Sequence, residues 1–144
     1  QDVDLSEGDG GNSKVQDLKR RCEMVRKIQP DCVLSIHQNS YPEEAIHGAQ
    51  VFYYEDSSEG KKLAEILQKH LVEVLDKENH RQAKGNRTYY MLKKTEATLV
   101  IVECGFLSNN QEALLLTDEK YQNKVAKAIC SGTLEYLSSL AEKK

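Results

Sequence analysis

The sequence has no hydrophobic run that approaches the roughly 18 residues of a membrane-spanning helix. It also has no excess of positive charge: the formal net charge is -3, which gives no electrostatic case for binding nucleic acid. The phosphate-binding loop, the GxGxxG dinucleotide fingerprint and the GxSxG nucleophile motif are all absent. With 39% hydrophobic and 30% charged residues, the composition is typical of an ordinary globular domain.

Paired cysteines are missing as well. None of the four cysteines, Cys22, Cys32, Cys104 and Cys130, forms a CxxC pair, so a zinc knuckle is not expected. Disulfides stay open as an alternative, because spacing alone cannot pair the cysteines. Cys32, Cys104 and Cys130 lie in apolar surroundings, and for these three we expect buried free thiols.

The 144 residues are enough for one domain with its own core, and we treat 1–144 as a single domain. The first residue is Gln1 and not Met, so we expect a chain that was processed or cut from a longer one. The first residues therefore do not reveal the cellular location.

Segments with strand and helix patterns alternate along the chain. Short apolar runs predict strands at 32–36, at 49–54 and at the start of 98–110. Apolar residues at helical spacing predict helices at 15–28, 59–78, 110–116 and 118–140. Residues 88–92 are interpreted as a short strand or turn, and 1–13 and 79–87 as polar loops. This order favours an α/β fold with a mostly parallel central sheet and helices on both faces.

Two of the predicted strands end in ionisable residues. The run 32–36 suits a strand covered on both faces, and His37 follows it directly. Glu103 follows the apolar strand that begins at 98. Ligands of open α/β sheets bind beyond the carboxyl ends of the strands, so parallel neighbours would open His37 and Glu103 onto one crevice. A neutral imidazole is a good zinc ligand, and a nearby carboxylate can act as general base toward a zinc-bound water.

Plainer interpretations exist for each of these residues. A histidine at a strand end is more often a hydrogen-bonded structural residue, and a glutamate there is more often half of an ion pair or a helix-cap partner. His47 could lie near the same crevice, whereas His70 and His80 are expected to face solvent. Cys104 follows Glu103 in an extended segment, so their side chains should point to opposite faces.

Two motifs together carry a family resemblance. SIHQNS at 35–40 and VECGFLSN at 102–109 closely resemble zinc-dependent N-acetylmuramoyl-L-alanine amidases of the Amidase_3 type. The segments 17–40, 47–54 and 112–137 also follow the order of that family, so the resemblance covers nearly the whole chain. GAQVFYY at 48–54, followed by a long charged helix, is most similar to the amidases of spore-forming bacteria that act during sporulation or germination.

The resemblance implies an activity and a site. These enzymes cleave the amide between N-acetylmuramic acid and L-alanine in peptidoglycan, and hold zinc with His, Glu and His. His37 corresponds to the second histidine ligand, and Glu103 to the catalytic acid/base. The resemblance also implies a bacterial protein that is secreted or associated with the cell wall. The alternative is a degenerate amidase fold that binds muropeptide without cleaving it, although the presence of Glu103 speaks against it.

One departure from the family is large. The D-P-G-H-G-G turn with the first histidine ligand, and the helix with the glutamate ligand, have no counterpart here. Residues 2–6 resemble the loop after the family's second strand, so we expect a catalytic domain that lacks the N-terminal strand, helix and strand. An unpaired sheet edge would result, and stable folding is expected to need the missing segment, another fragment or a second copy. Whether this chain alone is active stays open.

Overall fold

The computed structural model describes residues 13–143 and places them in a four-stranded sheet with five helices. In chain order the elements are α1 (Ser13–Ile28), β1 (Val33–Asn39), β2 (Gln50–Tyr54), α2 (Ser58–Leu75), β3 (Lys84–Asn86), α3 (Tyr90–Lys94), β4 (Leu99–Phe106), α4 (Asn110–Thr117) and α5 (Glu119–Ala141). This alternation confirms the predicted α/β fold class. The loop expected at 1–13 and the resemblance at 2–6 lie outside the described residues, apart from Ser13.

The strand order in the sheet is β1-β4-β2-β3. β1 runs parallel to β4 and β2 runs parallel to β3, whereas β2 runs antiparallel to β4. A mostly parallel sheet was expected, and the antiparallel pairing was not. It arises because β1 and β2 are joined by a loop without a helix, and a parallel return needs a long crossover connection.

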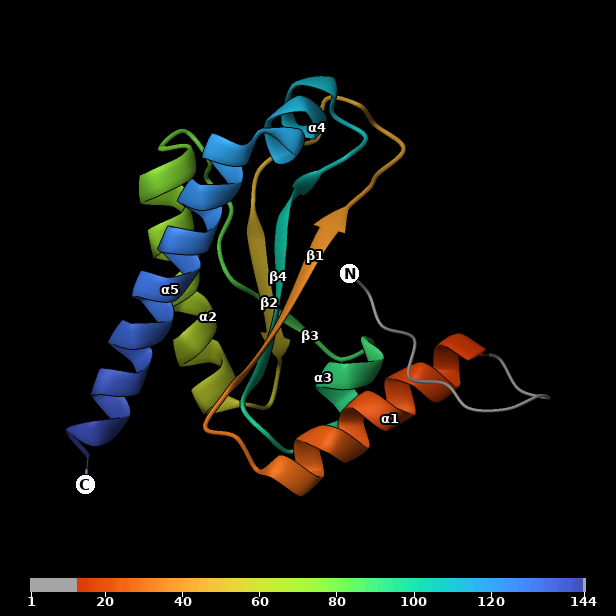
Figure 1. Cartoon of the computed structure of the whole chain (residues 1–144), viewed down its shortest axis with the longest axis vertical. Coiled ribbons are helices and arrows are strands. Elements are labelled where there is room, and N and C mark those ends of the chain that lie inside the picture. The colour runs from red at the N-terminus through yellow and green to blue at the C-terminus, as the bar shows by residue number, and fades with distance from the viewer. Residues whose placement is uncertain (1–12, 144) are drawn as a thin grey trace.

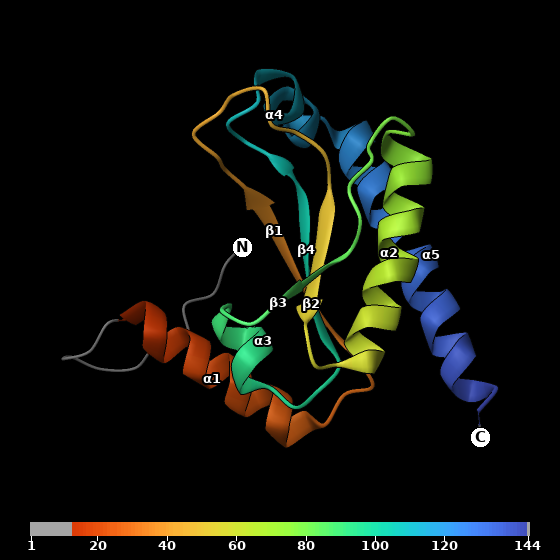
Figure 2. The ribbon, with the colours of Figure 1, turned by 180° about the vertical axis from the view of Figure 1, so that it is seen from behind.

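Helices cover both faces of the sheet, as predicted (Figures 1 and 2). On one face, α2 and α5 pack side by side over a core that includes Val51, Leu67, Val102 and Tyr136. On the other face, α1 and α3 lie near a smaller cluster of Phe52, Leu92, Leu99 and Ile101. None of the helices in the described part of the chain is long and apolar enough to cross a membrane.

β4 is the centre of the sheet. All eight residues of LVIVECGF are buried, because β4 lies between β1 and β2 and beneath helices on both faces. β1 was expected to be covered on both faces, and this prediction was wrong. Its seven residues are half-buried or exposed, and Ile36 is 51% exposed. The reason is position: within the described residues β1 is an edge strand, and a groove separates its outer face from α5.

Two local predictions are corrected. Residues 88–92 were expected to form a strand or turn, but Tyr90–Lys94 form the short helix α3. The polar stretch 79–87 was expected to be a loop throughout, but Lys84–Asn86 pair with β2 as β3. β3 is only three residues long, so it leaves the start of β2 without a strand partner on that side.

The side chain of Gln68 replaces the missing strand partner. Gln68 belongs to α2. Its amide oxygen accepts a hydrogen bond from Val51 N at 2.8 Å, and its amide nitrogen donates to Ala49 O at 3.0 Å. Gln68 is 5% exposed, so both of its polar atoms are satisfied where water is excluded. One buried glutamine therefore fixes the start of β2 on the helical layer.

The four cysteines are free thiols. Cys22 and Cys104 are buried and Cys32 is half-buried. Cys130 was expected to be buried, and this prediction was wrong: Cys130 is exposed on α5. It lines the groove between α5 and β1, which the described residues do not fill.

Candidate functional site

His37 and Glu103 are direct neighbours across the parallel strands β1 and β4. Their Cα atoms are register partners, and register partners on adjacent strands present their side chains on the same face. The expected juxtaposition of the two strand ends is therefore confirmed. Both residues lie toward the carboxyl ends of their strands, where α4 follows β4 (Figure 1).

Glu103 is a buried carboxylate with an unsatisfied oxygen. The residue is 9% exposed, and no donor among the described residues reaches Oε2. Burial raises the pKa of this carboxyl, and the charge of His37 opposes the rise only in part. A buried acceptor without a donor costs free energy, so a purely structural role explains Glu103 poorly.

His37 is exposed beside this carboxylate. Its Nε2 atom lies 2.7 Å from the hydroxyl oxygen of Ser35, two residues earlier on the same face of β1. This hydrogen bond can hold the ring in one orientation. The pair thus combines an oriented, accessible imidazole with a buried carboxylate on the next strand.

A third residue extends the row on the other side of Glu103. Gln50 is the register partner of Glu103 on β2. Its amide nitrogen donates to Gln82 O at 3.0 Å, and its oxygen accepts from Arg81 at 3.3 Å. Arg81 also donates to His47 O at 2.9 Å, and its guanidinium lies 5.0 Å from the centre of the Phe106 ring. His37, Glu103 and Gln50 therefore form a row across three strands, backed by Arg81.

Sequence reasoning missed Gln50 and Arg81. Gln50 lies opposite Glu103 because of the antiparallel register between β2 and β4, which no spacing along the chain indicates. Tyr89 was also missed. Its ring packs edge-to-face on Phe52 at 5.5 Å between centroids. Burial and the charge of Glu103 raise the pKa of Tyr89, so this phenol lies within electrostatic reach of the site.

The residues after Glu103 tie two loops together. Ser108 Oγ accepts from Tyr41 N at 3.0 Å, and Asn109 donates to Glu44 O at 2.9 Å. Asn109 also caps α4 by accepting from Glu112 N at 3.0 Å. The SN pair of the VECGFLSN motif thus joins the loop after β4 to the loop after β1.

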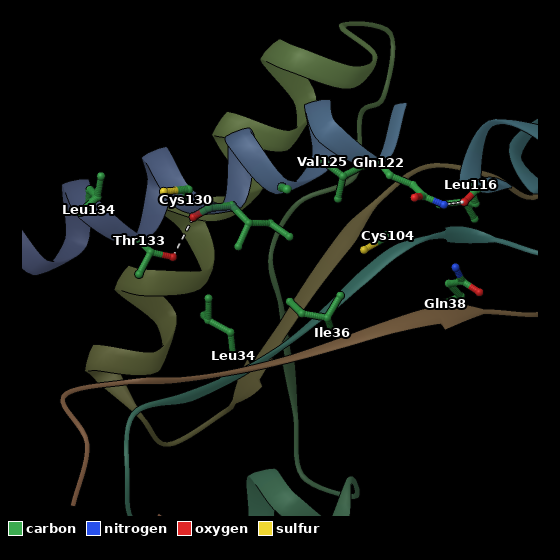
Figure 3. A pocket seen from close by; sticks show the side chains of 12 residues that line it. Leu34, Ile36, Gln38, Cys104, Leu116, Gln122, Val125, Cys130, Thr133 and Leu134 are labelled. Carbon is green, nitrogen blue, oxygen red and sulfur yellow. Dashed lines mark hydrogen bonds between the residues drawn. The ribbon is translucent and has the colours of Figure 1, made fainter. Parts of the chain in front are cut away.

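Cys104 points away from this row, as predicted from strand alternation. It lines an apolar groove of ≈ 630 Å³ on the opposite face, between β1 and α5. Figure 3 shows Leu34 and Ile36 of β1 facing Val125 and Thr133 of α5 across this groove. The groove and the Glu103 row lie on different faces of the sheet, so they are separate features.

The contacts of the other histidines are with residues other than His37 and Glu103. His47 is exposed, and its backbone oxygen accepts a hydrogen bond from Arg81. His70 was expected to face solvent, but its Nε2 lies 2.7 Å from Glu135 and bridges α2 to α5. His80 is exposed, as expected.

The described residues do not by themselves form a metal site. No group of three His, Cys, Asp or Glu side chains within 13–143 is placed to hold a metal ion. His37 fits one imidazole ligand, and the unsatisfied Oε2 of Glu103 fits an acceptor for a metal-bound water. A complete zinc site would therefore need further protein ligands beyond those that residues 13–143 of one chain bring together.

Comparison with known proteins agrees with the two motifs. Residues 3–135 match the family Amidase_3, described as N-acetylmuramoyl-L-alanine amidase. The chain is 37% identical over 140 residues to the germination-specific N-acetylmuramoyl-L-alanine amidase of Bacillus subtilis, covering 95% of this chain and 59% of that protein. It is 30% identical over 130 residues to the amidase LytC of the same organism, covering 87% of this chain and 25% of LytC.

The fold is also similar to solved amidase structures. One is the CwlD amidase from Clostridioides difficile, solved in complex with the GerS lipoprotein, with a TM-score of 0.91 and 37% identity. The match covers 96% of this chain and 73% of the CwlD chain. The chain thus spans little more than half the length of the germination-specific relative.

Proposed function

We propose that this chain, which belongs to the N-acetylmuramoyl-L-alanine amidase family, is the part of a zinc-dependent peptidoglycan amidase that carries the acid/base Glu103 and one zinc ligand, His37. The observation that carries the proposal is the unsatisfied, buried Glu103 oxygen beside an exposed imidazole in register with it. An unpaired buried acceptor costs free energy, and groups perturbed by burial in this way cluster at functional sites.

The substrate is inferred from the names of the relatives. They are germination-specific and cell-wall amidases, so we assign to this chain the amide between N-acetylmuramic acid and L-alanine in bacterial peptidoglycan. The same names support a protein that is secreted or associated with the cell wall. The solved relative that binds a lipoprotein supports a protein partner as well.

The proposed mechanism assigns one role to each residue. Zinc, when bound, lowers the pKa of a coordinated water to about 7 and polarises the substrate carbonyl. Glu103 accepts the proton of the attacking water and passes it to the leaving amine of L-alanine. The raised pKa of Glu103 suits this exchange, because a base with an ordinary carboxylate pKa holds a proton less well near neutral pH. His37 is the metal ligand, and Ser35 holds its ring.

The test uses the full-length protein with zinc and purified muropeptides. Mass spectrometry should show separation of the glycan from a peptide that begins with L-alanine. Glu103→Ala should lower kcat by roughly 10²–10⁴-fold, as for loss of a general acid/base. Glu119→Ala, which removes an exposed carboxylate at the start of α5, should leave kcat unchanged.

Two outcomes would count against the proposal. Hydrolysis that survives Glu103→Ala would remove Glu103 from the mechanism. Binding of muropeptide by the wild-type protein without any cleavage would instead favour the non-catalytic binding module.

A further inference from the structure

Glu112 is a second buried carboxylate near the site, and its oxygens are fully engaged. It lies in the first turn of α4 and is 8% exposed. Its Oε1 accepts from Phe106 N at 2.6 Å and from Gly48 N at 3.0 Å, and its Oε2 accepts from Gly48 N at 2.9 Å. Hydrogen bonds from backbone N–H groups to an ionised carboxylate are among the stronger ones in proteins.

The two N–H groups belong to the two segments that carry the proposed site. Gly48 lies near the end of the loop that leads from β1, with His37, to β2, with Gln50. Phe106 lies three residues after Glu103, where the pairing of β1 with β4 changes register. Between the partners His37↔Glu103 and Asn39↔Phe106, β1 advances by two residues and β4 by three. Such an extra residue bends a strand and leaves part of its backbone outside the sheet pairing.

Two glycines lie at the backbone segments that contact this carboxylate. A Cβ atom on Gly105 would lie 2.6 Å from Glu112 Oε1, so any side chain there would displace Glu112. Gly48 has φ +106°, and a Cβ there would lie 2.9 Å from Asn79 Oδ1. Both contacts are closer than packed atoms tolerate. The contact at Gly105 is with Glu112 itself, whereas a side chain at Gly48 would displace Asn79 and strain the loop whose N–H Glu112 accepts.

From these contacts we infer that Glu112 is a positioning residue: it ties the end of β4, just beyond Glu103, to the loop that joins β1 to β2, and so holds His37 and Glu103 where both face the same substrate bond. This inference rests on the proposed amidase function. Glu112 acts through the backbone at Gly48 and Phe106, and its carboxylate hydrogen bonds go to these two N–H groups and not to His37 or Glu103. Its role matters because a displacement of about 1 Å in a catalytic group can cost two orders of magnitude in rate.

A structural explanation is available for part of these contacts. Acidic residues are common in the first turn of a helix, where they favour the helix dipole. The first turn of α4, however, is already capped by Asn109, which accepts from Glu112 N. The Glu112 carboxylate binds the two loops instead of its own helix, so helix capping alone does not account for it.

The test compares Glu112→Gln with a control of similar structural effect. Glutamine keeps the size of the side chain and one acceptor oxygen for Phe106 N, but turns an NH₂ group toward Gly48 N. Ser57→Ala removes the cap of α2 at the far end of β2, where Ser57 Oγ accepts from Gly60 N. Both variants are assayed in the full-length, zinc-loaded protein, well below their unfolding temperatures.

We expect Glu112→Gln to lower kcat by at least about tenfold with little change in KM and no change in bound zinc. Ser57→Ala should keep the wild-type kcat. A Glu112→Gln variant whose kcat stays within twofold of Ser57→Ala would overturn the inference. If the glutamine variant does not fold, Glu112→Asp, which keeps the charge but shortens the reach, is judged by the same criterion.

A second readout separates this inference from the proposed function. The imidazole carbon–proton signals of His37 are recorded by NMR in zinc-free full-length protein. A shift of these signals in Glu112→Gln, absent in Ser57→Ala, supports positioning even if the wild-type protein hydrolyses no muropeptide. In that case the proposed function fails and the positioning role stands. Unchanged His37 signals in Glu112→Gln would overturn the positioning role.

Discussion

Gly105 and Glu112 lie so close together that a Cβ atom on the glycine would come within 2.6 Å of Glu112 Oε1 and 2.8 Å of its Cδ. Gly105→Ala should therefore push the carboxylate away from Phe106 N and destabilise the fold. Overpacking of a buried position typically costs about 1–3 kcal/mol, and we expect a value in the upper half of that range. Urea denaturation of the full-length protein measures the difference in the free energy of unfolding.

Gly85→Ala is the matched control for this substitution. Gly85 also lies in a strand, but its added Cβ would meet Glu55 Cγ at 3.2 Å, and the Glu55 side chain is exposed and can move. A change within about 0.5 kcal/mol is expected there. Equal losses for the two alanine variants would contradict the account of Gly105.

Gln68 should be a strong determinant of stability despite its distance from the proposed site. Gln68→Leu keeps the apolar volume but leaves Val51 N without its buried acceptor. We expect a loss of about 2 kcal/mol in the free energy of unfolding, within the usual range for an orphaned buried donor. Gln111→Leu, at an exposed position of α4, should change stability by less than about 0.5 kcal/mol. A loss for Gln68→Leu no larger than for this control would show that the bonds to β2 contribute little.

The thiols of Cys104 and Cys130 should differ sharply in reactivity. Burial, helped by the charge of Glu103, raises the pKa of Cys104 to about 11, whereas Cys130 is exposed. At pH 8 only about one Cys104 side chain in a thousand is then a thiolate, the form that reacts, and burial blocks the reagent as well. Timed alkylation of the 144-residue chain with iodoacetamide, under conditions where circular dichroism shows that it is folded, should label Cys130 first in the peptide map.

The control for this experiment is Cys130→Ser, which should remove the fastest labelling phase and leave Cys104 slow. Because the thiolate fraction of Cys104 rises with pH up to its pKa, its labelling should accelerate tenfold for each pH unit between 8 and 10. Labelling of Cys104 at the rate of Cys130 at pH 8 would contradict its burial.

Local sequence patterns predicted most of the elements, and the two motifs identified the family. The β-branched and apolar residues that begin at Leu99 indicate a buried strand, and Ser57 marks the start of α2 as its N-cap. Strand alternation also placed Cys104 and Glu103 on opposite faces. These features are readable because they depend on residues close together in the chain.

The remaining features depend on pairings between distant segments. The antiparallel register that brings Gln50 beside Glu103 leaves no mark on the spacing of either residue. β1 is exposed because it lies at the edge of the sheet, and its apolar sequence does not indicate that position. Glu112 looks like an ordinary acidic residue in a first helical turn until the positions of Gly48 and Phe106 are known.

The central claim is that His37 and Glu103 have different roles in one site. The most direct test measures zinc content and amidase rate in three forms of the full-length protein. The wild-type protein should bind about one zinc per chain and hydrolyse muropeptide. His37→Ala should lose both zinc and activity, whereas Glu103→Gln should keep zinc and lose activity. A Glu103→Gln variant that stays active, or a His37→Ala variant that keeps its zinc, would contradict the account.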